Sequence, residues 1–142
     1  MPKSITLLDR ASADLANVNF ILSNHHADEL QLDIAAYHIQ QTIEKTVKFY
    51  LQSNGIVFEK THDMDKLWTQ CEKAELPLPK WIYDNIDILN TYATQTRYGA
   101  DTVSSLRKIT QLATWAKELI AQLAPEETHE CSCTVDKVIF NP

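Results

Sequence analysis

Apolar residues recur every three or four positions along most of the chain, which is the spacing of one face of an α-helix. The longest such stretch runs from about Leu30 to about Ser53, or about 36 Å at a rise of roughly 1.5 Å per residue. Its apolar stripe consists of Leu32, Ala36, Ile39, Ile43, Val47 and Tyr50. Similar stripes cover Leu8–Leu22, Met64–Ala74, Trp81–Ala93 and Leu106–Leu123. The pattern therefore predicts four or five amphipathic helices.

Glycine and proline, which disfavour helix interiors, separate these stripes. The only glycines are Gly55 and Gly99, and Asn54-Gly55 predicts a left-handed stop for the longest helix. Pro77, Pro79 and Pro125 interrupt the chain after the third and last stripes. The predicted helix caps are Ser4, Thr61 or Asp63, and Asp101 or Thr102. Helices joined by such short loops predict an all-α, antiparallel up-and-down bundle over residues 1–124.

Residues 125–142 differ from the bundle and are predicted to form an acidic C-terminal tail. The tail carries Glu126, Glu127, Glu130 and Asp136 against Lys137 alone. Val135 to Phe140 is rich in β-branched and aromatic residues, which predicts a short strand. Such a strand would pair with another copy, lie in a groove or stay disordered, and the sequence leaves these alternatives open.

Composition narrows the class of protein. A length of 142 residues fits one domain, and a net charge of −6 argues against a nonspecific nucleic-acid coat while leaving room for a local basic patch. No apolar run is long enough to span a membrane, and the first ten residues lack the order of a signal peptide. Three cysteines cannot form a disulfide framework, which suits a reducing compartment. We therefore expect a cytoplasmic protein.

Neither a metal site nor a cofactor is predicted. His129, Cys131 and Cys133 are soft ligands, but three ligands this close together do not make the closed tetrahedral set that zinc prefers. The chain also has no glycine-rich phosphate loop, because its two glycines stand far apart.

Two stretches of the sequence carry a resemblance to a known family. Residues 35–48 read AAYHIQQTIEKTVK and are followed by KTHDMDKL at 60–67, and residues 89–98 read LNTYATQTRY. In this order they resemble the HEPN family (higher-eukaryote and prokaryote nucleotide-binding domains), and the resemblance spans roughly Ile5 to Leu123. It implies a bundle of four or five helices that commonly dimerises. Family members include metal-independent ribonucleases, toxins paired with small nucleotidyltransferases, and non-catalytic modules that bind RNA or nucleotides.

The ribonuclease branch of that family depends on an Arg-x(4–6)-His motif, which this chain lacks. Arginine would neutralise charge on the phosphate and histidine would move a proton. The chain has only three arginines, Arg10, Arg97 and Arg107, and none is followed by a histidine at that spacing. The resemblance therefore favours a non-catalytic module.

Arg97 and Tyr98 are the first candidate site residues. Arginine offers a bidentate fork to phosphate, and tyrosine offers a ring on which a base can stack. The structural alternative is that Arg97 caps the last carbonyls of its helix or bridges to a carboxylate, while Tyr98 packs on the bundle.

A second group of candidates lies on the longest helix and after it. Lys45 and Lys48 share a helix face, and Lys60 and His62 could join them in a basic, phosphate-binding patch. The structural alternative is a solvated face with Glu44 and Lys48 as an i,i+4 ion pair. The neighbouring polar residues Gln40, Gln41 and Glu44 are expected either to rim a groove or to mark where this helix meets solvent or a second subunit.

Three functions stay open at this point. The favoured one is a binding module that takes nucleotide, RNA or a partner nucleotidyltransferase, and the resemblance implies that it is a homodimer. A divergent toxin-type ribonuclease would use Arg97 with His62 or His38. A purely structural dimerisation domain is the third.

Overall fold

The computed structural model describes residues 4–98 and 105–125, and the side chains of 4–94 and 105–125. These residues form six helices: α1 (Leu7–Leu22), α2 (Glu29–Ser53), α3 (Met64–Lys73), α4 (Lys80–Asp84), α5 (Ile86–Tyr98) and α6 (Leu106–Leu123). The described part of the chain contains no strand, so the all-α prediction is confirmed. The predicted strand at 135–140 lies outside the described residues.

Two helix ends follow the prediction, the end of α2 and the start of α3, and the start of α2 is capped by a residue for which no role was predicted. Asp28 begins α2 with a capping box, in which its carboxylate accepts from the Gln31 backbone and the Gln31 side chain accepts from the Asp28 backbone. At the other end of α2, Gly55 takes a φ of 76°, the left-handed conformation expected after Asn54. Asp63 caps α3, as predicted.

Two predicted helix starts are wrong. Thr6, rather than Ser4, caps α1, because Thr6 is the residue with an acidic partner three positions on, and Asp9 completes a capping box with it. Ser105 caps α6 by accepting from the Lys108 backbone. The predicted caps Asp101 and Thr102 lie outside the described residues.

The single helix predicted to start after Pro79 is broken at Asn85, which is a correction to the sequence prediction. Asn85 is 7% exposed, and its amide donates to the Trp81 carbonyl at 2.6 Å. Its side-chain oxygen accepts from Lys108 on α6 at 2.9 Å. Asparagine competes in this way with the backbone of a helix, so α4 ends and α5 begins without a glycine or proline to signal the break.

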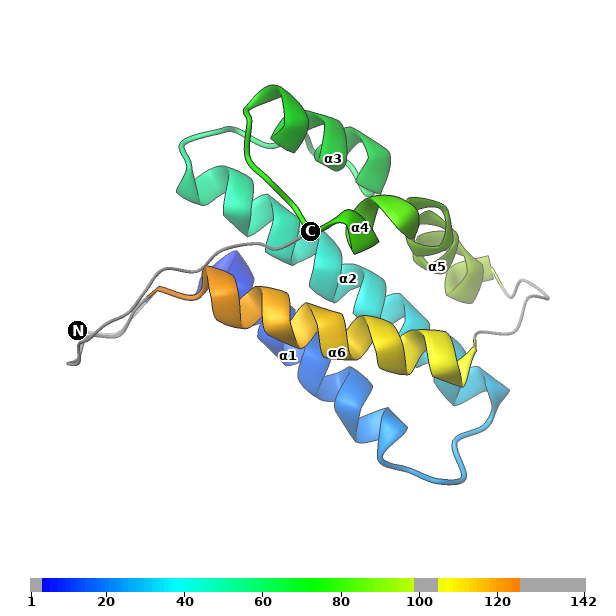
Figure 1. Cartoon of the computed structure of the whole chain (residues 1–142). Helices are drawn as coiled ribbons and strands as arrows, with labels where there is room; N and C mark the ends of the chain where they lie inside the picture. The colour runs from blue at the N-terminus through cyan, green and yellow to red at the C-terminus, as the bar shows by residue number, and fades with distance from the viewer. Residues whose placement is uncertain (1–3, 99–104, 126–142) are drawn as a thin grey trace.

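The long helix α2 lies at the centre of the bundle and packs against α1, α5, α6 and α3 (Figure 1). Figure 1 also shows that α1 and α5 run in the opposite direction to α2 and α6, as in an antiparallel up-and-down bundle. No helix in the described ranges is both long and apolar enough to cross a membrane.

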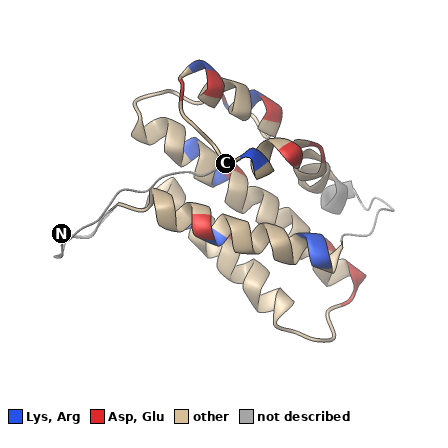
Figure 2. Ribbon diagram, viewed as in Figure 1, with Lys and Arg blue, Asp and Glu red and all other residues tan. Residues whose placement is uncertain are grey.

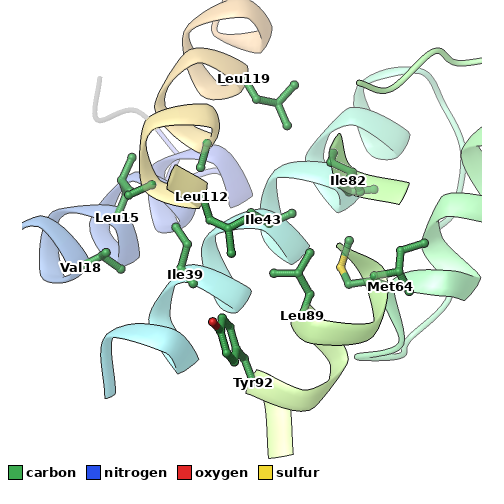
Figure 3. Close-up of a cluster of buried hydrophobic side chains, with 14 of the residues drawn as sticks. Leu15, Val18, Ile39, Ile43, Met64, Ile82, Leu89, Tyr92, Leu112 and Leu119 are labelled. Carbon is green, nitrogen blue, oxygen red and sulfur yellow. The ribbon is translucent and has the colours of Figure 1, made fainter. Parts of the chain in front are cut away.

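The core is made by the apolar stripes of all six helices (Figure 3). The labelled core side chains in that view are Leu15, Val18, Ile39, Ile43, Met64, Ile82, Leu89, Tyr92, Leu112 and Leu119. From α2, Ile39, Ile43 and Val47 are fully buried. The stripe on which the sequence prediction rested is therefore the axis of the core.

Tyr92 brings a polar atom into this core. The residue is 3% exposed, and its hydroxyl is buried with no hydrogen-bond partner among the described residues. Burial raises the pKa of Tyr92 to about 12, and the negative charge of Asp33 adds to the shift. Burial alone raises the pKa of the Cys71 thiol to about 12. Both groups therefore keep their protons to a higher pH in the folded protein than in the unfolded chain.

We expect Tyr92→Phe to flatten the loss of stability at alkaline pH. The unfolded chain releases the tyrosine proton near pH 10, whereas the folded protein holds it to about 12, so the free energy of unfolding falls as pH rises through this window. The fall that Tyr92 causes is about 1.4 kcal/mol per pH unit. Urea titrations at pH 7 and at pH 9 to 11 measure it. At pH 7 the variant should be as stable as wild type or more stable by about 1 kcal/mol, because it removes an unsatisfied hydroxyl.

Candidate functional site

A buried carboxylate, Glu44, lies on α2 and is only 2% exposed. Gln40 donates its amide to Glu44 Oε1 at 2.7 Å, and Lys48 donates Nζ to Oε2 at 2.8 Å. The Nδ1 atom of His62 lies 3.1 Å from Oε1 and 3.2 Å from Oε2. Three polar groups thus satisfy the buried charge, which is the condition for burying a carboxylate without a prohibitive desolvation cost.

We call Gln40, Gln41, Glu44, Lys48 and His62 the Glu44 cluster. Gln41 joins it by donating its amide to Gln40 Oε1 at 2.8 Å. Gln40 and Glu44 were expected at a groove rim or where the helix meets solvent, but Gln40 is 0% exposed, so that prediction is wrong for both. The physical reason is the loop after α2, which returns over this face and brings His62 to Glu44 and Phe58 to Lys48. Positions 40, 44 and 48 lie one above another on the helix, so their side chains also satisfy one another. The predicted Glu44–Lys48 pair does form, but it is buried rather than solvated.

His62 reaches the Glu44 cluster from the loop between α2 and α3. Its side chain is 71% exposed even though Nδ1 contacts a buried carboxylate. Its Nε2 has no hydrogen-bond partner among the described residues. On the same loop, the Phe58 ring lies under the Lys48 ammonium, 5.3 Å from Nζ to the ring centroid, which is a cation–π geometry. The loop is therefore held to α2, while most of the His62 side chain stays accessible to solvent.

A second acidic centre joins α1 to α2. Asp14 on α1 accepts from Lys45 Nζ at 2.6 Å, and its other oxygen lies 3.0 Å from His38 Nδ1. We call Asp14, His38 and Lys45 the Asp14 cluster. The side chain of Asp14 is 13% exposed, and those of His38 and Lys45 are about twice as exposed. A carboxylate on α1 that contacts two side chains of α2 in this way helps to fix how α1 packs on α2.

The two lysines predicted to share a phosphate patch therefore turn to different carboxylates. Lys45 reaches Asp14 on α1, whereas Lys48 reaches Glu44. Lys60 is exposed and lies two residues before His62. Across the ribbon in Figure 2, Lys and Arg are interspersed with Asp and Glu on several helices. Of the predicted patch, Lys48 and His62 meet at the same carboxylate, Glu44, whereas Lys45 is directed to Asp14.

Arg97 and Tyr98 belong to the last turn of α5, and their side chains lie outside the described ones. The position of α5 is set by Asn90, whose amide donates to Asp63 at 2.9 Å and whose oxygen accepts from the Met64 backbone at 2.9 Å. Arg97 follows Asn90 by seven residues, or about 10 Å along the helix axis at roughly 1.5 Å per residue. The backbone of Arg97 therefore lies that length along α5 from Asn90, the residue that contacts the end of the α2–α3 loop.

Comparison with known proteins agrees with this architecture. The family model described as HEPN domain matches residues 6–136, which is nearly the whole chain. The chain belongs to the HEPN domain family. No match was found among curated proteins or among solved structures. The family match runs past Leu123, where the sequence resemblance was expected to end, and into the segment predicted as a tail.

Asp14 and Asn90 help to organise this HEPN domain but had no predicted role, and Gln40 was predicted only at a groove rim or at the edge of the core. All three hold their partners from positions beside the apolar stripes. Asp14 lies 24 and 31 positions from its two partners. Only the two stretches that carry the family resemblance, residues 35–48 with Gln40 and 89–98 with Asn90, could have drawn attention to two of the three.

Chemically, this HEPN domain offers two carboxylate–histidine pairs, each with one member on α2: Glu44 with His62 of the α2–α3 loop, and His38 with Asp14 of α1. A carboxylate on Nδ1 fixes the orientation of the ring and leaves Nε2 for other groups. Among residues 4–94 and 105–125, no group of three or more His, Cys, Asp or Glu could hold a metal ion. The candidate metal ligands His129, Cys131 and Cys133 lie outside the described residues.

Proposed function

We propose that this HEPN domain is a non-catalytic module that binds phosphate groups of nucleotide or RNA beside the α2–α3 loop. The observation that carries the proposal is His62, whose side chain is 71% exposed while Nδ1 contacts buried Glu44. An imidazole held in this way presents Nε2 to a ligand at little entropic cost. Lys60, two residues earlier and exposed, supplies a cation. Arg97 on α5 would reach a phosphate farther along the same ligand.

The absence of catalysis in this proposal follows from what surrounds His62. The chain has no Arg-x(4–6)-His motif. The cations closest to His62 in sequence on α2, Lys45 and Lys48, are engaged by Asp14 and Glu44. In this proposal Lys60 and Arg97 bind the phosphates, but no arginine is paired with a histidine as in the ribonuclease motif, so proton transfer and charge neutralisation are not combined at one phosphodiester.

Nucleotide binding by variants of the loop tests the proposal. We expect a fluorescent ATP analogue and a labelled 12-residue RNA to bind wild type, and Lys60→Ala/His62→Ala to weaken binding by about tenfold, since charge-assisted hydrogen bonds are worth roughly 1.5–3 kcal/mol. Lys117→Ala, which removes an exposed lysine from α6, is the matched control and should change binding less than twofold, or about 0.4 kcal/mol. Equal weakening by both variants, or no binding by wild type, would count against the proposal.

One observation favours a second candidate function, the divergent toxin-type ribonuclease. A carboxylate that orients a histidine is also how general bases are prepared for proton transfer, and both His62 and His38 have such a partner. On this alternative, Arg97 of the same chain or of a second copy neutralises the phosphate. RNA cleavage without metal that disappears in His62→Ala or His38→Ala distinguishes it from simple binding.

Assembly forms part of the same proposal. Leu30 and Ile34 are 68% and 41% exposed and lie one turn apart on α2, so they form an apolar strip that a second copy could cover. We infer a homodimer, in a cytoplasmic setting, with a small nucleotidyltransferase as the candidate protein partner. A purely structural dimerisation domain is the outcome if the protein dimerises and binds no nucleotide.

A further inference from the structure

An apolar groove with an acidic rim runs along the outside of α3 and α4. Three concavities join there: two share Trp68, Glu72 and Leu78, and two share Asp65 and Tyr83. The central one has a volume of about 440 Å³. Figure 1 shows α3 and α4 on the side of α2 away from α1. We call this surface the α3–α4 groove.

The floor of the α3–α4 groove is aromatic. The rings of Trp68 on α3 and Tyr83 on α4 have centroids 5.3 Å apart and planes tilted by 48°. Tyr83 is 56% exposed, although a ring of its size gains by burial. Leu78 and Pro77 extend the apolar surface toward Cys71. Exposed aromatic rings in a concave site are typical of the centre of a binding surface.

The rim of the α3–α4 groove is negatively charged. Asp65 and Glu72 on α3 and Asp84 on α4 line it, and Asp63 and Asp87 lie at its end. Lys80 is the one cationic side chain that lines these three concavities, and its Nζ lies 3.9 Å from Asp84 with both groups exposed. One weak surface pair leaves most of the acidic charge without a counter-charge from the lining residues.

Charge decides which ligand fits. Nucleic acid is negatively charged, as this rim is, and so is the protein's own tail, whose sequence has four acidic residues and one lysine. Neither is therefore expected to bind the groove. A guanidinium group satisfies both features of the groove, because it stacks on aromatic rings and pairs with carboxylates through a planar fork. We propose that the α3–α4 groove docks an arginine-containing segment of a partner protein, on a surface distinct from the His62 loop.

Fluorescence anisotropy with labelled nona-arginine tests this in the full chain at 0.15 M salt. We expect saturable binding that Asp65→Asn/Asp84→Asn weakens by roughly five- to tenfold, from two ion pairs each worth up to about 1 kcal/mol. Glu59→Gln/Glu118→Gln changes the net charge equally at exposed sites outside the groove and should weaken binding less than about twofold, since it touches only the screened long-range field. Circular dichroism checks that each variant is folded.

Tyr83→Ala separates docking from general charge attraction, since it leaves every charge in place. Loss of the stacked ring should weaken binding by about threefold. Equal weakening by the two double variants, an unchanged affinity in Tyr83→Ala, or no binding by wild type would overturn the proposal. Because the ATP analogue uses the His62 loop, failure of nona-arginine to bind leaves the nucleotide proposal standing, and the reverse also holds.

Discussion

Glu44→Ala is expected to lower the free energy of unfolding by about 3–5 kcal/mol, the cost of removing one partner from a buried, hydrogen-bonded ion pair. The substitution leaves the Lys48 ammonium and the Gln40 amide without their acceptor in a site that is closed to solvent. It also releases His62 and with it the α2–α3 loop. Urea unfolding followed by circular dichroism measures the change.

Two comparisons make the Glu44 result specific. Glu118→Ala removes an exposed carboxylate from α6 and should change stability by no more than about 0.5 kcal/mol. In a double-mutant cycle, Glu44→Ala/Lys48→Ala should cost less than the sum of the two single changes, because the double variant leaves no buried charge unpaired. Additive losses, or a Glu44→Ala loss as small as that of Glu118→Ala, would contradict the described cluster.

The second large effect is expected at Ile43, which is fully buried on the central face of α2 (Figure 3). Ile43→Ala should lower the free energy of unfolding by about 2–5 kcal/mol, since it removes buried methyl groups and leaves a cavity among neighbours on several helices. Phe20→Ala, on the neighbouring helix α1 but 78% exposed, is the control and should cost less than about 0.5 kcal/mol. Similar losses at both positions would mean that α2 is not the axis of the core.

The buried stripe and the end of α2 could be predicted from the sequence. The spacing of Ile39, Ile43 and Val47 predicted the buried stripe, and all three are fully buried. Asn54 and Gly55 predicted the end of the helix. These features are local, because helical periodicity and capping depend on residues within one or two turns.

The burial of Glu44 could not be predicted in the same way. Gln40 and Glu44 border the apolar stripe and are polar, so periodicity assigns them to the rim. They are buried because the loop that carries Phe58 and His62 returns across this face. That return is a contact between residues 18 positions apart, and neither propensity nor pattern specifies it.

The helix break at Asn85 could not be predicted from the sequence for a related reason. Glycine and proline mark helix ends through their own backbone properties, whereas Asn85 ends α4 through bonds to Trp81 and to Lys108 on α6. Lys108 is 23 positions away, so the decisive partner is supplied by the tertiary fold. Lys45 likewise turned toward Asp14 on α1 rather than toward Lys48. At the candidate site, the residue types were predicted and their pairings were not.

One measurement tests the central claim, that this HEPN domain binds RNA or nucleotide without cutting it. A labelled RNA is incubated with wild type, Arg97→Ala and His62→Ala in EDTA, and the bound fraction and the intact fraction are read from the same samples. The account predicts saturable binding by wild type, binding weakened by about threefold in each single variant, and RNA that stays intact throughout. RNA cleaved by wild type but not by His62→Ala, or no binding by any of the three proteins, would contradict it.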